Sequence, residues 1–202
     1  MRKIQADGLI LAGGKGKRMG GIYKGALVYQ KETFIQRLVN ILKKETTKLY
    51  ISYGTEHRGN FTGCELLFDR YSDIGAIGGL LEGFSNGSEE WMLVAACDMP
   101  FLEGKMYQYL WAALESASEN YIGVVPVMNG KIHPLAAIYR KSMAETLKKQ
   151  IEKKNYCLMD ALKQEKILYV SLPNGQGFEK MLENINTPKE YEALRRLEEK
   201  WV

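Results

Sequence analysis

Cysteine, histidine and long apolar runs are all scarce in this 202-residue chain. The three cysteines, Cys64, Cys97 and Cys157, have no C-x-x-C spacing and cannot all pair within the chain, which favours reduced thiols. No apolar stretch approaches the roughly 20 residues that span a bilayer, and the first residues contain no signal-peptide apolar region. A disulfide-stabilised or membrane-associated protein is therefore not expected, and a cytoplasmic location is.

The motifs of hydrolases and of nucleic-acid binders are also missing. Neither His57 nor His133 lies near a G-x-S-x-G nucleophile elbow. The net charge of +4 is modest, and no basic helix face with interleaved aromatic residues is evident, so no nucleic-acid partner is expected. Because the chain has no internal repeat, low-complexity segment or long linker, we expect a single domain over residues 1–202.

Apolar runs of strand length alternate with segments of helical spacing. The expected strands are 8–12, 49–53, 65–68, 91–96, 122–127 and, at an edge, 167–172. This alternation predicts an α/β fold with a largely parallel sheet.

Helix starts are indicated by three capping boxes, each a Ser or Thr followed three residues later by Glu or Gln. They are Thr33 with Gln36, Ser142 with Glu145, and Thr187 with Glu190. The apolar stripe Tyr191, Leu194, Leu197 and Trp201 predicts that the last helix is docked on the protein.

The most distinctive segment is 9–24, where an apolar strand pattern gives way to a basic, glycine-rich loop. Glycines let backbone N–H groups approach phosphate oxygens without obstruction by a Cβ atom, and basic side chains neutralise phosphate charge. The loop supplies both, with Gly13, Gly14, Gly16, Gly20, Gly21, Lys15, Lys17, Arg18 and Lys24. The sequence therefore predicts a triphosphate-binding loop.

Two common phosphate-binding motifs do not fit this loop. The fingerprint G-x-G-x-x-G would need glycine where the chain has Met19, and no Gly-Lys-Ser or Gly-Lys-Thr occurs at the Walker spacing. The loop instead resembles the L-A-G-G-x-x-x-R-M-G-x-x-K signature of the nucleotidyltransferases that activate sugars and cofactors. The matching residues are Leu11, Ala12, Gly13, Gly14, Arg18, Met19, Gly20 and Lys24, with residues 21–23 as a variable insert.

A candidate metal ligand follows the apolar run 91–96, which ends in Cys97-Asp98-Met99-Pro100. Ligands of open α/β sheets bind beyond the carboxyl ends of the strands, so Asp98 is expected beside the glycine-rich loop. Mg²⁺ prefers one or two carboxylates together with phosphate oxygens and water. Asp98 is therefore the predicted Mg²⁺ ligand, and its segment resembles the metal motif of the same superfamily. A solvated turn aspartate is the alternative.

Another acid precedes a glycine-rich helix start in segment 68–80. This segment is similar to the D-x(n)-G-P-L-A-G stretch of nucleotidyltransferases that make molybdenum dinucleotide cofactors, in which the acid and glycines lie beside the nucleoside. Residues 75–79 depart from that pattern, since they lack the proline and have glycine in place of alanine. The resemblance implies that Asp69, Gly75 and Gly79 contact the nucleotide, whereas a turn role is the alternative for Asp69.

Two motifs in the C-terminal half narrow the resemblance. His133-Pro134-Leu135 is similar to the H-P-L segment of the molybdenum cofactor guanylyltransferases, and residues 184–188 are similar to their closing N-x-N-T-P. This implies acceptor contacts from His133, Asn184 and Asn186. A core position for His133 and a helix-cap role for Asn186 are the alternatives.

The resemblance covers essentially the whole chain. It implies a single-domain, three-layer α/β/α fold whose mostly parallel, Rossmann-like sheet has an antiparallel edge. The N-terminal half would bind the nucleotide and the C-terminal half the acceptor.

The implied reaction is transfer of GMP from GTP to the phosphate of the molybdenum pterin cofactor, Mo-molybdopterin, with release of pyrophosphate and with Mg²⁺ as cofactor. Arg18, Lys24 and Asp98 are the implied catalytic residues. The implied nucleotide contacts are Leu11, Ala12, Gly13, Gly14, Lys15, Lys24, Ser52, Asp69, Gly75, Gly79 and Asp98. Transfer of CMP, a sugar or alcohol phosphate acceptor, and a non-catalytic pterin-delivery module stay open, as do transient contacts with molybdoenzymes or cofactor chaperones.

Overall fold

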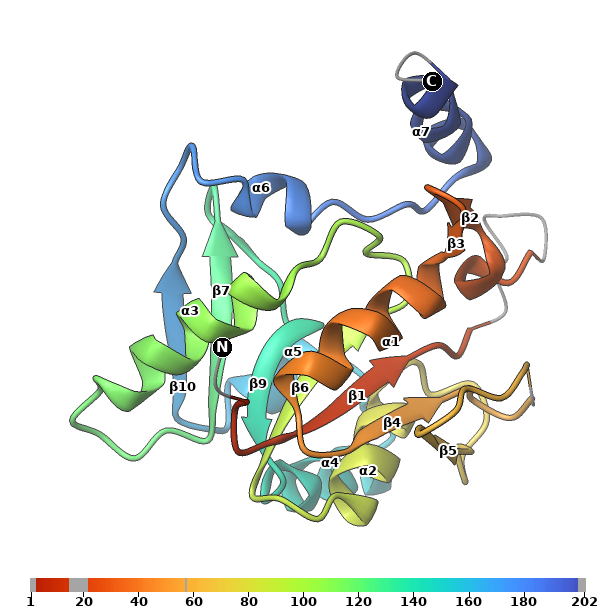
Figure 1. The fold of residues 1–202 in the computed structure, drawn as a ribbon. Coiled ribbons are helices and arrows are strands. Elements are labelled where there is room, and N and C mark those ends of the chain that lie inside the picture. The colour runs from red at the N-terminus through yellow and green to blue at the C-terminus, as the bar shows by residue number, and fades with distance from the viewer. Residues whose placement is uncertain (1–2, 15–21, 57, 200–202) are drawn as a thin grey trace.

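The computed structural model describes residues 3–14, 22–56 and 58–199, and over these ranges the chain builds one large mixed sheet with helices on both faces (Figure 1). The strand order across the sheet is β10-β7-β9-β6-β1-β4-β5, and β8 pairs with β7. The bounds of these strands are β1 Asp7–Leu11, β4 Leu49–Ser52, β5 Glu65–Leu67, β6 Trp91–Ala96, β7 Gly123–Met128, β8 Lys131–Ile132, β9 Ala136–Arg140 and β10 Ile167–Ser171.

Helices connect most of these strands, and a small hairpin lies outside the sheet. The helices are α1 Phe34–Glu45, α2 Ala76–Asn86, α3 Gly104–Glu115, α4 Met143–Glu152, α5 Leu158–Leu162, α6 Phe178–Met181 and α7 Pro188–Glu199, with a short 3₁₀ turn η2 at Lys24–Ala26. Strands β2 (Val28–Tyr29) and β3 (Glu32–Thr33) form the separate antiparallel pair. Within the described ranges, none of the helices combines the length and hydropathy needed to cross a membrane.

The expected antiparallel strand is present but lies inside the sheet. Strand β9 runs antiparallel to both of its neighbours, β6 and β7, whereas the edge strand β10 is parallel to β7. The reason is local: β7 and β8 are joined by the two-residue turn Asn129-Gly130, in which both residues have positive φ. Such a turn reverses the chain within two residues, so the returning strand pairs antiparallel beside β7.

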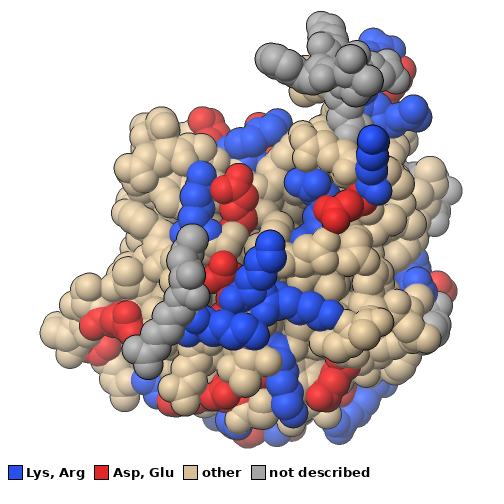
Figure 2. Space-filling model, viewed as in Figure 1, with Lys and Arg blue, Asp and Glu red and all other residues tan. Residues whose placement is uncertain are grey.

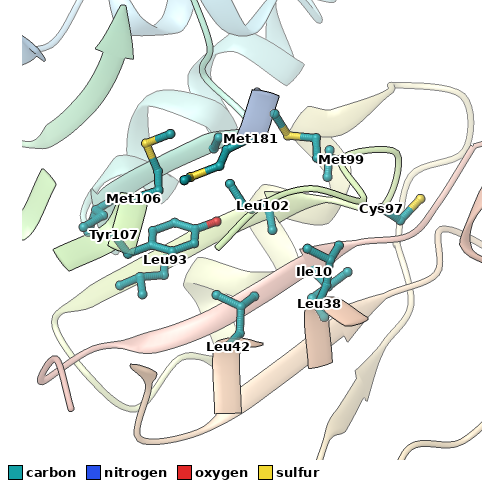
Figure 3. Packing of buried hydrophobic residues seen from close by; sticks show 14 of the residues in the cluster. Ile10, Leu38, Leu42, Leu93, Cys97, Met99, Leu102, Met106, Tyr107 and Met181 are labelled. Carbon is teal, nitrogen blue, oxygen red and sulfur yellow. The ribbon is translucent and has the colours of Figure 1, made fainter. Parts of the chain in front are cut away.

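Alternation along the strands divides the core into two layers. In β1, Ile10 packs on one face with α1, α3 and α6, whereas Leu9 and Leu11 pack on the other face with α2, α4 and α5. Figure 3 shows Ile10 and Leu93 of the sheet in one cluster with Leu38 and Leu42 of α1 and Tyr107 of α3. This arrangement confirms the three-layer α/β/α fold.

The sheet has a topological switch point at β1. From β1 the chain crosses over to β4 on one side and later returns to β6 on the other, with both pairings parallel. The loops that follow these strands must therefore diverge and leave a crevice at their carboxyl ends. Segments 12–14, 53–56 and 97–98 all emerge at this crevice.

Charge on the face that carries α1 and α3 is mixed. Figure 2 shows Lys and Arg side chains gathered near the middle of this face, with acidic side chains bordering them. The last turn of α1 contributes Lys43 and Lys44. The positive charge of the chain is therefore not confined to the glycine-rich loop.

Two of the three predicted capping boxes form at least the cap bond. Thr33 Oγ1 accepts from the Gln36 N–H at 3.2 Å, and Thr187 with Glu190 forms the reciprocal pair at the start of α7. The Ser142 cap was wrong: its side chain makes no cap bond, because its backbone is already in the right-handed helical region instead of the extended region that a capping side chain needs.

The last helix is docked only in part. Tyr191 and Leu194 pack with Leu27 and Phe34, but Leu197 is half exposed and Trp201 lies outside the described residues. In Figure 1, α7 projects from the body of the protein and lies against β2 and β3.

The cap assignments can be tested with a matched pair of alanine variants. Thr33→Ala should lower the free energy of unfolding by about 1 kcal/mol, because it removes the bond to the Gln36 N–H. Ser142→Ala should change it by less than about 0.5 kcal/mol, because no cap bond is lost. Urea unfolding followed by circular dichroism measures both values. A Ser142→Ala loss equal to that of Thr33→Ala would contradict the assignment.

Candidate active site

A cavity of about 570 Å³ opens at the crevice. Its walls come from the loops after β1, β4, β5 and β6, from the start of α2, and from the segment that precedes α7. The predicted site residues that line it are Leu11, Gly13, Gly14, Lys24, Ser52, Asp69, Gly75, Gly79, Asp98, Asn184 and Asn186. The fold thus brings together residues from nearly the whole length of the chain.

Two predicted residues, Ala12 and His133, lie away from the cavity wall. Ala12 is fully buried, and its backbone N–H donates to Ser52 O at 2.7 Å, so the residue joins two strand ends and does not line the cavity. His133 is also buried and absent from the cavity wall. Its backbone N–H donates to Pro126 O, and burial lowers the pKa of its imidazole, with the charge of Lys131 adding to the effect. Lys15 and Arg18 lie outside the described residues.

The polar centre of the cavity is an ion pair between Lys24 and Asp98. Lys24 Nζ lies 2.9 Å from Asp98 Oδ2 and also donates to Asn186 Oδ1 at 2.7 Å. Asn184 Nδ2 donates to the second carboxylate oxygen, Asp98 Oδ1, at 3.2 Å. Both charged side chains are mostly buried, at 20% and 17% exposed. The backbone helps as well, since the Ile185 N–H donates to Asp98 O at 2.8 Å.

Close backbone approach explains why glycines occupy two positions in the wall. A Cβ atom on Gly13 would lie 3.0 Å from the backbone nitrogen of Gly54, so the loops after β1 and β4 could not meet as they do. A Cβ atom on Gly79 would lie 2.6 Å from Ser52 Oγ and 2.7 Å from Leu11 Cδ2. Glycine therefore lets the first turn of α2 pack directly on the ends of β1 and β4.

A second polar group lies where α2 begins. Ser52 Oγ donates to Asp69 Oδ1 at 2.9 Å. Burial raises the pKa of Asp69, while the hydrogen bond from Ser52 lowers it and the charge of Glu82 raises it further. Gly75 caps α2 without a side-chain bond, and Gly75, Ala76 and Gly79 all line the cavity. An uncapped helix start presents free N–H groups, which suit an anionic or strongly polar ligand.

The oxygen donors of the cavity suit a metal ion that is bound together with a triphosphate. Across the described ranges, no group of three or more His, Cys, Asp or Glu side chains gathers to hold an ion. Asp98 provides one mostly buried carboxylate, and Asn186 provides an amide oxygen nearby. Mg²⁺ commonly binds through one or two carboxylates, with phosphate oxygens and water completing its shell, so this donor set fits a metal–triphosphate complex.

Among the cavity residues that sequence analysis missed, Tyr23, Tyr53 and Arg58 lie together. The rings of Tyr23 and Tyr53 lie 6.2 Å apart in an edge-to-face arrangement, and the Arg58 guanidinium lies over the Tyr23 ring at 4.7 Å. Arg58 also pairs with Glu56 at 2.8 Å. Tyr23 lies in the variable insert, Tyr53 at the end of an expected strand and Arg58 in a polar loop, and none belongs to a motif, so only their spatial convergence identifies them.

Cys97 also lines the cavity, where its surroundings favour the protonated thiol. The residue is 6% exposed, and burial together with the adjacent charge of Asp98 raises its pKa to about 12. A protonated thiol is neither a nucleophile nor a metal ligand.

Known proteins resemble this chain over nearly its full length. A family model described as MobA-like NTP transferase domain matches residues 8–167. A relative from Clostridium perfringens (strain SM101), named probable molybdenum cofactor guanylyltransferase, is 31% identical and aligns over 97% of this chain and 99% of its own. A relative of the same name from Carboxydothermus hydrogenoformans is 30% identical over 93% of this chain and 94% of its own.

Solved structures share the fold. Molybdopterin-guanine dinucleotide biosynthesis protein A from Archaeoglobus fulgidus superposes with a TM-score of 0.77 at 21% identity, covering 96% of this chain and 99% of its own. The 2-C-methyl-D-erythritol 4-phosphate cytidylyltransferase from Thermus thermophilus gives 0.69 at 12% identity, with 96% and 98% covered. From the family match and the full-length relatives, this chain belongs to the MobA-like NTP transferase family and is a nucleotidyltransferase.

Proposed function

We propose that this enzyme transfers GMP from GTP to the phosphate of the molybdenum pterin cofactor and releases pyrophosphate. The observation that carries the proposal is the similarity to proteins named molybdenum cofactor guanylyltransferase, which extends over 97% of this chain and 99% of the relative. Similarity over that length includes the C-terminal segment with Asn184 and Asn186, which lies beyond residues 8–167 of the family match and beside the Lys24–Asp98 pair.

In the proposed reaction a phosphate oxygen of the acceptor attacks the α-phosphorus of GTP. The bond from that phosphorus to the bridging oxygen breaks, and the bonding electrons leave with pyrophosphate. Such transfers depend on positioning and charge neutralisation, so no covalent enzyme intermediate is needed. Lys24 would stabilise charge on the α-phosphate, and Lys15 with Arg18 would hold the leaving phosphates. Bound Mg²⁺ would supply further positive charge, with Asp98 as its protein ligand.

The two ends of the cavity suggest how the substrates are arranged. The Ser52–Asp69 pair and the start of α2 form the side assigned to the nucleoside, where Asp69 and backbone groups could bond guanine. Asn186 is hydrogen-bonded to Lys24 and Asn184 to Asp98. This arrangement supports the proposal that the acceptor phosphate binds next to the reacting centre. His133 is removed from the acceptor proposal because it does not line the cavity.

Asp98→Asn should lower the transfer rate at least about a hundredfold, because an amide cannot neutralise a metal or a lysine as a carboxylate does. The measurement is pyrophosphate release with Mg²⁺, GTP and the pterin acceptor. Asp160→Asn is the matched control, since Asp160 is a surface residue of α5 bonded to Lys163 and outside the cavity. Both variants should keep the wild-type circular dichroism spectrum, while Asp98→Asn should lower the melting temperature because Lys24 loses its carboxylate partner. A transfer rate near that of wild type in Asp98→Asn would refute the role assigned to this carboxylate.

The nucleotide can be identified by thermal stabilisation, because a ligand that binds the native state raises the melting temperature. With Mg²⁺ present, GTP should raise it more than ATP, CTP or UTP. A larger shift with CTP would move the assignment to CMP transfer. Stabilisation by GTP without pyrophosphate release would favour a pterin-delivery module, and release only with a sugar phosphate would favour a different acceptor.

A further inference from the structure

We propose that Tyr191, on α7, is a positioning residue that holds Lys24 at the reacting centre. The inference rests on the proposed function only in giving Lys24 a catalytic role. Its geometric basis is that the segment 184–194 contacts the Lys24 region at two separate places. One contact is at Val28, the first residue of β2, and the other is at Lys24 itself, the first residue of η2.

The first contact is a pair of hydrogen bonds from one hydroxyl group. Tyr191 Oη accepts from the Val28 N–H at 3.1 Å and donates to Val28 O at 3.0 Å. A single side chain thereby occupies both backbone groups of a residue only four positions after Lys24. Val28 is the first residue of β2, so this bond fixes the point where the chain leaves η2 for the hairpin.

The second contact reaches the lysine itself. Asn186 Oδ1 accepts from Lys24 Nζ at 2.7 Å, while the Asn186 backbone N–H donates to Glu190 Oε2 at 2.6 Å. Glu190 also accepts from the Thr187 N–H, and these bonds hold the pKa of its carboxyl below the usual range. The cap of α7 therefore orients the residue that receives the lysine.

An apolar cluster joins the two contacts. Leu27, Phe34, Ile185 and Leu194 are buried together, and the Tyr191 ring packs edge-to-face on Phe34 with centroids 6.1 Å apart. In Figure 1, α7 stands away from the central sheet and lies over β2 and β3. The helix adds little to the main core, so its contacts act chiefly on the segment that contains Lys24.

A flexible side chain with several rotatable bonds reacts efficiently only when it is held in the productive geometry. Tyr191→Phe removes the hydroxyl but keeps the ring on Phe34, so the helix should stay folded. The Lys24 segment should then move more freely, and Lys24 Nζ should spend less time at Asp98 and Asn186. The consequence is a loss in turnover with little change in binding of the nucleotide.

The first test measures Lys24 without any substrate. Acetylation of the protein by an N-hydroxysuccinimide ester, followed by peptide mass spectrometry, reports the reactivity of each lysine. Lys24 should react at least about threefold faster in Tyr191→Phe than in wild type, relative to Lys163, which is 70% exposed and remote from α7. Tyr156→Phe, at an exposed tyrosine outside the cavity, is the matched control and should leave the ratio unchanged.

The second test uses kinetics of pyrophosphate release. Tyr191→Phe should lower kcat by about five- to tenfold while KM for the nucleoside triphosphate changes by less than about twofold. In an Asn186→Ala background the same change should still lower kcat, because the Tyr191 hydroxyl acts through Val28 and not through the Asn186 bond.

The outcomes separate this inference from the proposed function. Unchanged Lys24 acetylation in Tyr191→Phe overturns the positioning role, whichever substrates the enzyme uses. A kcat for the Tyr191→Phe, Asn186→Ala double variant equal to that of Asn186→Ala alone overturns the proposed route through Val28. If acetylation of Lys24 is faster but the enzyme prefers another nucleotide or acceptor, the positioning role of Tyr191 is supported and only the proposed substrates must be changed.

Discussion

The interaction on which the site depends is the mostly buried ion pair between Lys24 and Asp98. Removing either partner leaves the other charged and poorly hydrated, which is costly for groups so little exposed. Asn186 accepts a further hydrogen bond from Lys24, and Asn184 donates one to Asp98. Three segments far apart in sequence must therefore meet at one point, and the fold keeps them there.

The topology of the sheet explains why the Lys24–Asp98 pair lies near the carboxyl ends of β1 and β6. Parallel strands end at the same side of the sheet, and the chain passes from β1 to β4 on one side of β1 and later returns to β6 on the other. Glycines at positions 13 and 79 allow the loops and α2 to approach closely enough to close the wall of the cavity. Phosphate chemistry needs such backbone approach because N–H groups and helix starts supply much of the binding.

Sequence patterns predicted strands β1, β4, β5, β6, β7 and β10 and the side-chain caps at Thr33 and Thr187, since each depends on neighbouring residues. They did not predict that β9 would lie inside the sheet, because strand order depends on which strands pair across long distances. The Ser142 cap failed for a related reason: the motif fixes the residue types, whereas the backbone angles follow from the turn that ends β9.

Two features of the site could be recognised from local sequence, the glycine-rich segment after β1 and the aspartate two residues after β6, because each belongs to a strand and the turn that follows it. Tertiary structure alone decided that Asn186 meets Lys24 across 162 positions, that Arg58 stacks on Tyr23, and that His133 stays out of the cavity. Those contacts join segments far apart in the chain, and no local sequence pattern indicates which segments will meet. The contacts form only when packing of the two apolar layers fixes the position of each loop.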